Sequence, residues 1–135
     1  MAGTACHVLC STTRLGLTWV LGRMKDSIER LLDHYATVTD GSSALLRADL
    51  IALCQRRAVS EPQFCDTFAR ELASRYASGD LDAERAAFAA DDLHAAADFT
   101  LPPFARRVFD LLEYREASPA EARQLLAGHS HGTAA

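Results

Sequence analysis

Lysine is almost missing from this sequence. Of its 14 basic residues only Lys25 is a lysine, and 18 acidic residues bring the net charge to −4. The other basic residues are arginines, which are suited to forked, paired contacts rather than to solvation as point charges. Binding to nucleic acid requires a concentrated basic surface that neutralises phosphates. The charge balance disfavours such a surface, so we expect no nucleic-acid partner.

Other features that would identify a function class are also missing. No apolar run approaches the roughly 20 residues that a membrane-spanning helix needs, so we expect no membrane partner. Residues 1–13 contain neither Lys nor Arg, which a secretory signal peptide would need. There is no glycine-rich phosphate loop and no H-E-x-x-H motif. Four cysteines, two of them on apolar helix faces, indicate reduced thiols in a cytoplasmic protein rather than a disulfide framework.

The composition favours one small domain. The chain has 135 residues, and 49% of them are hydrophobic, which is enough to fill a single core. We expect an all-α fold, a small bundle of five to six helices over residues 24–128. Residues 1–23 are predicted to form a flexible extension, or to precede a true start at Met24. Residues 129–135 are predicted to form a disordered tail, because they are small and polar.

Residues 44–78 carry the strongest pattern and predict a helical hairpin. The second half repeats large apolar residues every four positions, which places them on one helical face. These are Phe64, Phe68, Leu72 and Tyr76, and the first half has a similar stripe of Leu46, Leu50, Leu53 and Cys54. Between the halves, Ser60 and Gln63 form a capping box with Pro62 in the first turn. Gly79 is placed to end the hairpin in a left-handed conformation.

The other helices are predicted from shorter patterns. We expect them over residues 24–36, 81–90, 92–100, 104–114 and 118–128. The break near residue 91 rests on Asp91 and Asp92, which indicate a restart of the helix. The double proline Pro102-Pro103 must interrupt the helical pattern, because proline donates no amide hydrogen and restricts the residue before it.

No pattern of reactive side chains indicates catalysis. A catalytic site needs a nucleophile with a base, or paired carboxylates with a proton donor. The histidines are scattered, at positions 7, 34, 94, 129 and 131. Cys6, His7 and Cys10 have a metal-like spacing but no second ligand cluster nearby, so incidental thiols are favoured over a zinc site. We therefore expect a protein that is not an enzyme and has no cofactor and no metal.

The segment from Asp80 to Phe99 is the one stretch with functional content. Six carboxylates against Arg85 alone give it a charge of −5. A solvated helix face, stabilised by carboxylates near a helix N-terminus, is the simpler interpretation. The sharper one is a docking surface for a basic partner protein, because clustered carboxylates accelerate encounter by long-range attraction.

Several stretches together resemble a known family. They are residues 49–53, the capped turn with Phe64, residues 70–76, the alanine-centred segment 92–99 and residues 121–126. Over about residues 46–127 the chain resembles the colicin D immunity family, the small bacterial self-protective colicin-like immunity proteins. The resemblance implies a helical bundle that blocks the active site of a cognate toxin, in that family a nuclease that cuts transfer RNA.

The resemblance also implies which residues face the toxin. In that family acidic side chains stand in for the phosphates of the RNA. Carried over by position, Asp92 and Asp98 are the first candidates for partner binding, followed by Asp91 and Glu84. The chain departs from the family at residues 101–107, where an apolar and then basic stretch replaces an acidic loop. The rival hypothesis is a helical regulatory or scaffold subunit that assembles through an apolar face.

Overall fold

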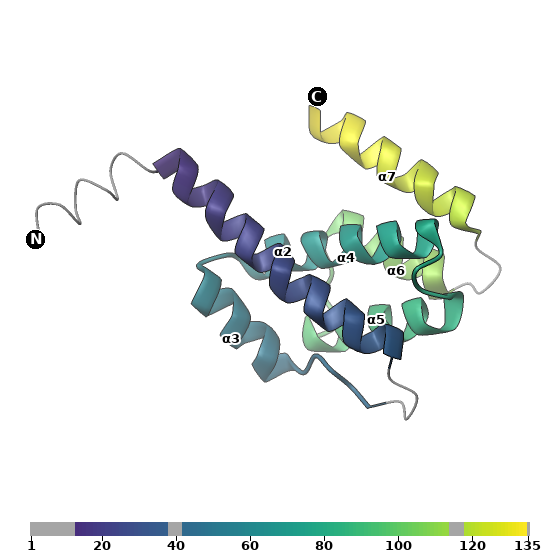
Figure 1. Ribbon diagram of the computed structural model, residues 1–135, viewed down its shortest axis with the longest axis horizontal. Coiled ribbons are helices and arrows are strands. Elements are labelled where there is room, and N and C mark those ends of the chain that lie inside the picture. The colour runs from purple at the N-terminus through teal and green to yellow at the C-terminus, as the bar shows by residue number, and fades with distance from the viewer. Residues whose placement is uncertain (1–12, 38–41, 114–117, 135) are drawn as a thin grey trace, which may run out of the picture.

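The computed structural model describes residues 13–37, 42–113 and 118–134, and this part of the chain contains six helices and no strand (Figure 1). They are α2 (Thr13–Thr37), α3 (Arg47–Arg57), α4 (Glu61–Ser78), α5 (Ala83–Ala96), α6 (Pro103–Glu113) and α7 (Pro119–Ala134). The predicted all-α bundle of five to six helices is confirmed.

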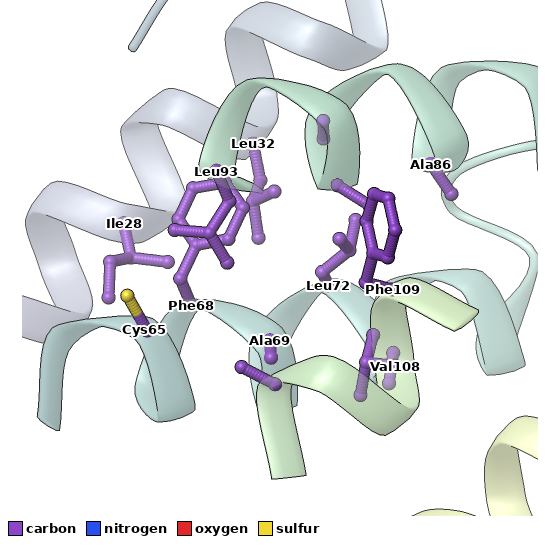
Figure 2. Close-up of a cluster of buried hydrophobic side chains, with 14 of the residues drawn as sticks. Ile28, Leu32, Cys65, Phe68, Ala69, Leu72, Ala86, Leu93, Val108 and Phe109 are labelled. Carbon is purple, nitrogen blue, oxygen red and sulfur yellow. The ribbon is translucent and has the colours of Figure 1, made fainter. Parts of the chain in front are cut away.

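Helix α4 is the centre of the bundle. It contacts each of the other five described helices. Its stripe of four large side chains, Phe64, Phe68, Leu72 and Tyr76, is buried as predicted. In Figure 2, Phe68 and Leu72 of α4 point towards Leu32 of α2, Leu93 of α5 and Phe109 of α6. Leu50 and Cys54 of α3 and Ala122 of α7 belong to the same core, so all six described helices contribute to it.

Side-chain caps define where the helices begin and end. The hydroxyl of Ser60 accepts a bond from the amide of Gln63, whose side chain accepts one from the amide of Ser60. Gly79 ends α4 with a φ of 89°, a left-handed conformation that glycine adopts without strain. Asp66 of α4 accepts a bond from the amide of Ala105, so one helix caps the next. The predicted limits of α4 are confirmed.

Two predicted helix ends are wrong because glycine was given too much weight. Helix α2 includes residues 24–36 but begins at Thr13, although residues 1–23 were predicted to be an extension. Helix α7 passes through Gly128 and ends at Ala134, although residues 129–135 were predicted to be a tail. A single glycine inside a helix costs only about 1 kcal/mol relative to alanine, so it does not stop the helix. Residues 1–12 and 135 lie outside the described part.

A ring contact holds part of α7 beyond Gly128. The imidazole of His129 stacks on the ring of Phe104 in α6, with 3.9 Å between ring centroids. Before that point α7 buries Ala122 fully and Leu125 and Leu126 partly.

Helix α5 is continuous, so the predicted pair of helices at 81–90 and 92–100 is wrong. Asp82 caps the first turn by accepting a bond from the amide of Arg85. Asp91 and Asp92 lie inside the helix and do not restart it. The helix ends at Ala96, six residues before the double proline, so the turn that follows belongs to neither α5 nor α6.

Arginine side chains hold the C-terminal ends of three helices from neighbouring elements. Arg85 donates to the carbonyl of Ala36 in α2, Arg123 to Ala77 in α4, and Arg47 to Ala96 in α5. The last carbonyls of a helix lack partners within it and carry partial negative charge, which a guanidinium satisfies. The excess of arginine over lysine therefore has a structural use: it ties the helices together.

Candidate functional site

Glu84 and Asp91 form an exposed acidic face on α5. They lie seven residues apart, about two helical turns, and therefore project from the same side of the helix. Asp98 continues this spacing but lies beyond the end of α5, and it too is exposed. Among the described residues neither Glu84 nor Asp98 is part of an ion pair. Three of the four predicted partner-binding carboxylates are therefore open to solvent.

Asp92 is not part of that exposed face, and its predicted place at a partner surface is corrected here. It is 7% exposed and is the one charged side chain buried among the described residues. Its carboxylate accepts bonds from the Tyr35 hydroxyl (2.5 Å), the Ser43 hydroxyl (3.0 Å) and the Ala44 amide (3.2 Å). These donors supply the partners that a buried carboxylate requires. Asp92 therefore connects α5 to α2 and to the segment before α3.

The pKa of Tyr35 reflects the same arrangement. Burial, the hydrogen bond to Asp92 and the negative charge of Asp92 raise the pKa of the Tyr35 phenol above its ordinary value of 10.0. The phenol therefore stays protonated and keeps donating to Asp92 at all physiological pH values. The contact is structural rather than a titrating device.

The turn after α5 presents an aromatic side chain to solvent. Asp98 and Phe99 both have positive φ, 57° and 60°, and Phe99 is 68% exposed. An aspartate tolerates this left-handed conformation, whereas a bulky residue there is a genuine outlier. The ring of His94 contacts Phe99 edge-on at 5.2 Å and lies 4.4 Å from the ring of Phe109. Phe99 is thus held outward on a packed histidine.

A groove opens beside this turn, which we call the turn groove. It has a volume of about 460 Å³. Its apolar wall consists of Pro62, Cys65, Ala97, Leu101 and Pro102, and its polar rim consists of Arg47, Glu61, Asp98 and Thr100. These residues come from the start of α3, the start of α4 and the segment between α5 and α6.

Arg47 is fully engaged at the rim of the turn groove. Its guanidinium donates to both carboxylate oxygens of Glu61, at 2.6 and 3.3 Å, and to the carbonyl of Ala96. The hydrogen bond to Glu61 and the charges of Glu61 and Asp98 raise the pKa of Arg47. The Arg47–Glu61 pair is neutral overall. The additional charge of Asp98 therefore makes the net charge of the rim negative.

The exposed apolar residues beside the groove were missed in the sequence. Leu46 was predicted to belong to the buried stripe of α3, but it precedes that helix and is 57% exposed. Phe99 was placed inside a helix. Asp92 carried a readable signal, because it lies three residues after Ala89 and four before Ala96, both buried. The left-handed turn at Asp98 and Phe99 gave no signal in the sequence, because neither residue is a glycine.

The thiols of the described residues are poorly suited to nucleophilic chemistry. Cys54 and Cys65 are buried and unbonded to each other. Burial raises the pKa of both thiols, that of Cys65 from 9.0 to about 12. The thiolate is the reactive form, so both remain unreactive near neutral pH.

Residues 13–37, 42–113 and 118–134 contain no group of three or more His, Cys, Asp or Glu side chains arranged to hold a metal ion. None of the helices described there has the length and apolar character needed to cross a membrane. The Cys6–Cys10 spacing lies outside these residues.

Comparison with known proteins gives no relative for this chain. No family model, no curated protein and no solved structure matches it.

Proposed function

We propose that this protein binds a basic partner protein and inhibits it without catalysis, through the exposed carboxylates of Glu84, Asp91 and Asp98. The partner suggested by the resemblance to immunity proteins is a bacterial toxin, most simply a nuclease whose active site is basic. The protein would then act by covering that active site.

One observation supports this proposal above others: an exposed aromatic side chain lies next to an exposed carboxylate that has no ion-pair partner in the described residues. Phe99 directly follows Asp98 in the turn after α5, and Asp91 is exposed on α5 itself. Protein interfaces place aromatic anchors at their centre and charges around them, where the charges steer the encounter. Glu84 extends the same negative surface by two turns.

The first test replaces the three carboxylates by their amides, Glu84→Gln, Asp91→Asn and Asp98→Asn. Asparagine tolerates the left-handed conformation at position 98, so the turn is preserved. The partner is identified by pull-down with the wild-type protein and mass spectrometry, and both proteins are then titrated against it by calorimetry. We expect at least about 2 kcal/mol of lost binding, roughly thirtyfold, and affinity that falls as salt rises.

The matched control makes the same change in net charge elsewhere, with Asp26→Asn, Glu29→Gln and Glu113→Gln. If the acidic face is the binding surface, this variant keeps most of the wild-type affinity. Equal losses of affinity in the two triple variants would show that the net charge of the protein, and not the acidic face, determines binding. Wild-type affinity in the first variant, with no salt dependence, would contradict the proposal.

A second candidate function rests on the two exposed apolar side chains. Leu46 and Phe99 are the large hydrophobic residues exposed among the described ones, as a scaffold subunit that assembles through an apolar face would require. In that case Phe99→Ala would abolish assembly while the amide triple variant would not change it. Sedimentation of both variants separates this candidate from the first.

A further inference from the structure

The turn groove has the properties of a docking site for a segment of another protein. The two large hydrophobic residues exposed in the described part of the chain, Leu46 and Phe99, are each next in sequence to a residue that lines it. Leu46 precedes Arg47, and Phe99 lies between Asp98 and Thr100, so each follows or precedes a residue of the rim. Exposed apolar residues scattered singly need no explanation, but two of them at one groove mark an interaction surface.

The backbone beside the groove is strained. Phe99 adopts a left-handed conformation, which costs a residue with a β-carbon roughly 1–2 kcal/mol. Strained residues of this kind concentrate at ligand-binding sites, where the surrounding structure holds them in place. Here His94 supports the Phe99 ring at its edge, so the ring is fixed before a partner arrives.

The charges at the rim specify what the groove accepts. Arg47 is occupied by Glu61 and by the carbonyl of Ala96, so it offers no free cation to a ligand. Asp98 forms no ion pair among the described residues and faces the same groove. A cationic side chain would satisfy Asp98, whereas an anionic one would be repelled. The apolar wall next to Asp98 favours an aliphatic neighbour of that cation.

We infer that the turn groove binds an extended segment of the partner that carries an aliphatic side chain directly before an arginine or lysine. The aliphatic side chain lies against Leu101 and Pro102, and the cation pairs with Asp98. This inference rests on the proposed function, because it names the part of the basic partner that reaches this site. A second copy of the chain is a poor occupant of the groove. Each copy carries a net charge of −4, so two identical molecules repel each other.

The test uses a defined probe, the peptide acetyl-Gly-Leu-Arg-Gly-amide, titrated into the ¹⁵N-labelled full chain and followed by NMR. We expect saturable shifts at the amides of residues 46–47 and 97–101. Two control peptides carry Glu in place of Arg, or Ala in place of Leu, and each should bind at least tenfold more weakly. Equal binding of the Glu peptide, or shifts centred on another face, would overturn the inference.

Two variants locate the site independently of the peptides. Asp98→Asn keeps the left-handed turn and should weaken the Arg peptide at least tenfold. Thr100→Tyr places a bulky side chain at the rim and should block the peptide while circular dichroism stays unchanged. Glu113→Gln, an exposed carboxylate at the end of α6 that lines neither the groove nor the acidic face, should leave peptide binding as in the wild type. Unchanged peptide affinity in Asp98→Asn would contradict the inference even if Thr100→Tyr failed to fold.

The partner protein separates this inference from the proposed function. If the amide triple variant loses the partner but Thr100→Tyr keeps it fully, the acidic face binds and the groove does not. If Asp98→Asn and Thr100→Tyr both lose the partner but the double change Glu84→Gln with Asp91→Asn keeps it fully, the groove inference stands and the proposed acidic face on α5 fails. A concentration-dependent doubling of mass that Phe99→Ala abolishes would assign the groove to a second copy and overturn the inference.

Discussion

The carboxylate of Asp92 joins three separate parts of the chain. It lies in α5 and accepts bonds from Tyr35 in α2 and from Ser43 and Ala44 in the segment before α3. Tyr35 is buried and Ala44 is half-buried, so the donors of these two residues would otherwise be left without a partner, whereas Ser43 is exposed. Such networks stabilise a fold when every member is satisfied, and they become costly when one member is removed.

We predict that Asp92→Ala destabilises the protein by about 3 kcal/mol, because it leaves the Tyr35 hydroxyl and the Ala44 amide unsatisfied. Urea denaturation monitored by circular dichroism measures the change. The control is Glu84→Ala on the exposed side of the same helix, where a loss of less than about 1 kcal/mol is expected. Equal losses of stability in Asp92→Ala and Glu84→Ala would show that the hydrogen bonds of Asp92 do not stabilise the fold.

We also predict that stability falls at alkaline pH because of Cys65. Its pKa in the folded protein is about 12, against an ordinary value of 9.0. Above pH 9 the unfolded chain therefore loses this proton while the folded chain keeps it, which favours unfolding. The contribution is complete below pH 9 and is lost as pH rises towards 12, at up to about 1.4 kcal/mol per pH unit.

Urea denaturation of the wild type and Cys65→Ala between pH 8 and 11 tests this. The variant loses packing at every pH, but its stability should decline less steeply above pH 9. The remaining slope should include Tyr35, whose raised pKa acts in the same direction from about pH 10. Parallel pH curves for the two proteins would refute the assignment to Cys65.

At the scale of the helices, arginine contacts provide stability that no apolar pattern records. Arg123 of α7 donates to the carbonyl of Ala77 at 2.8 Å, near the end of α4. We predict that Arg123→Ala costs about 1 kcal/mol, since it removes a charged hydrogen bond at a helix C-terminus. Arg70→Ala is the control, because Arg70 is exposed on α4 and should change stability by less than about 0.5 kcal/mol. Thermal melts of both variants measure this difference, and equal losses of stability in Arg123→Ala and Arg70→Ala would contradict the prediction.

The local signals of the sequence were sufficient for the most strongly patterned elements. The limits of α4 could be predicted, because Ser60, Gln63 and Gly79 act on their own neighbours. The burial of Phe68 followed from spacing alone. The single helix α5 could not be read as easily, because Asp92 looks like a helix breaker until Tyr35 is known to lie opposite it. Tyr35 lies 57 residues before Asp92 in the chain, so no local sequence pattern can reveal their contact.

The candidate site shows the same division. The charges of Glu84, Asp91 and Asp98 could be seen in the sequence, and the structure places all three at the surface. The turn groove could not be predicted, because its walls come from three distant segments. The exposure of Phe99 was also hidden, since it depends on a left-handed turn without glycine.

At the scale of the whole molecule, the first part of α2 stands apart. In Figure 1 its N-terminal turns extend away from the other helices. Within the residues whose burial is described, the core begins at Met24, which is 1% exposed. We predict that removing residues 1–23 leaves the melting temperature within a few degrees of the wild type. Calorimetry of the shortened protein measures this, and a fall of about ten degrees, more than 1 kcal/mol in a domain of this size, would show that those residues pack on the bundle.

The central place of α4 has a consequence for synthesis on the ribosome. Domains form as the chain emerges, N-terminal part first, at roughly 5–20 residues per second. When α4 leaves the ribosome, α2 and α3 are ready to pack on it, but α5, α6 and α7 have not yet emerged. The apolar side of α4 that those helices cover in the folded protein then remains exposed to solvent for several seconds. The nascent chain is therefore most exposed to aggregation, and most dependent on chaperones, between the completion of α4 and the arrival of α7.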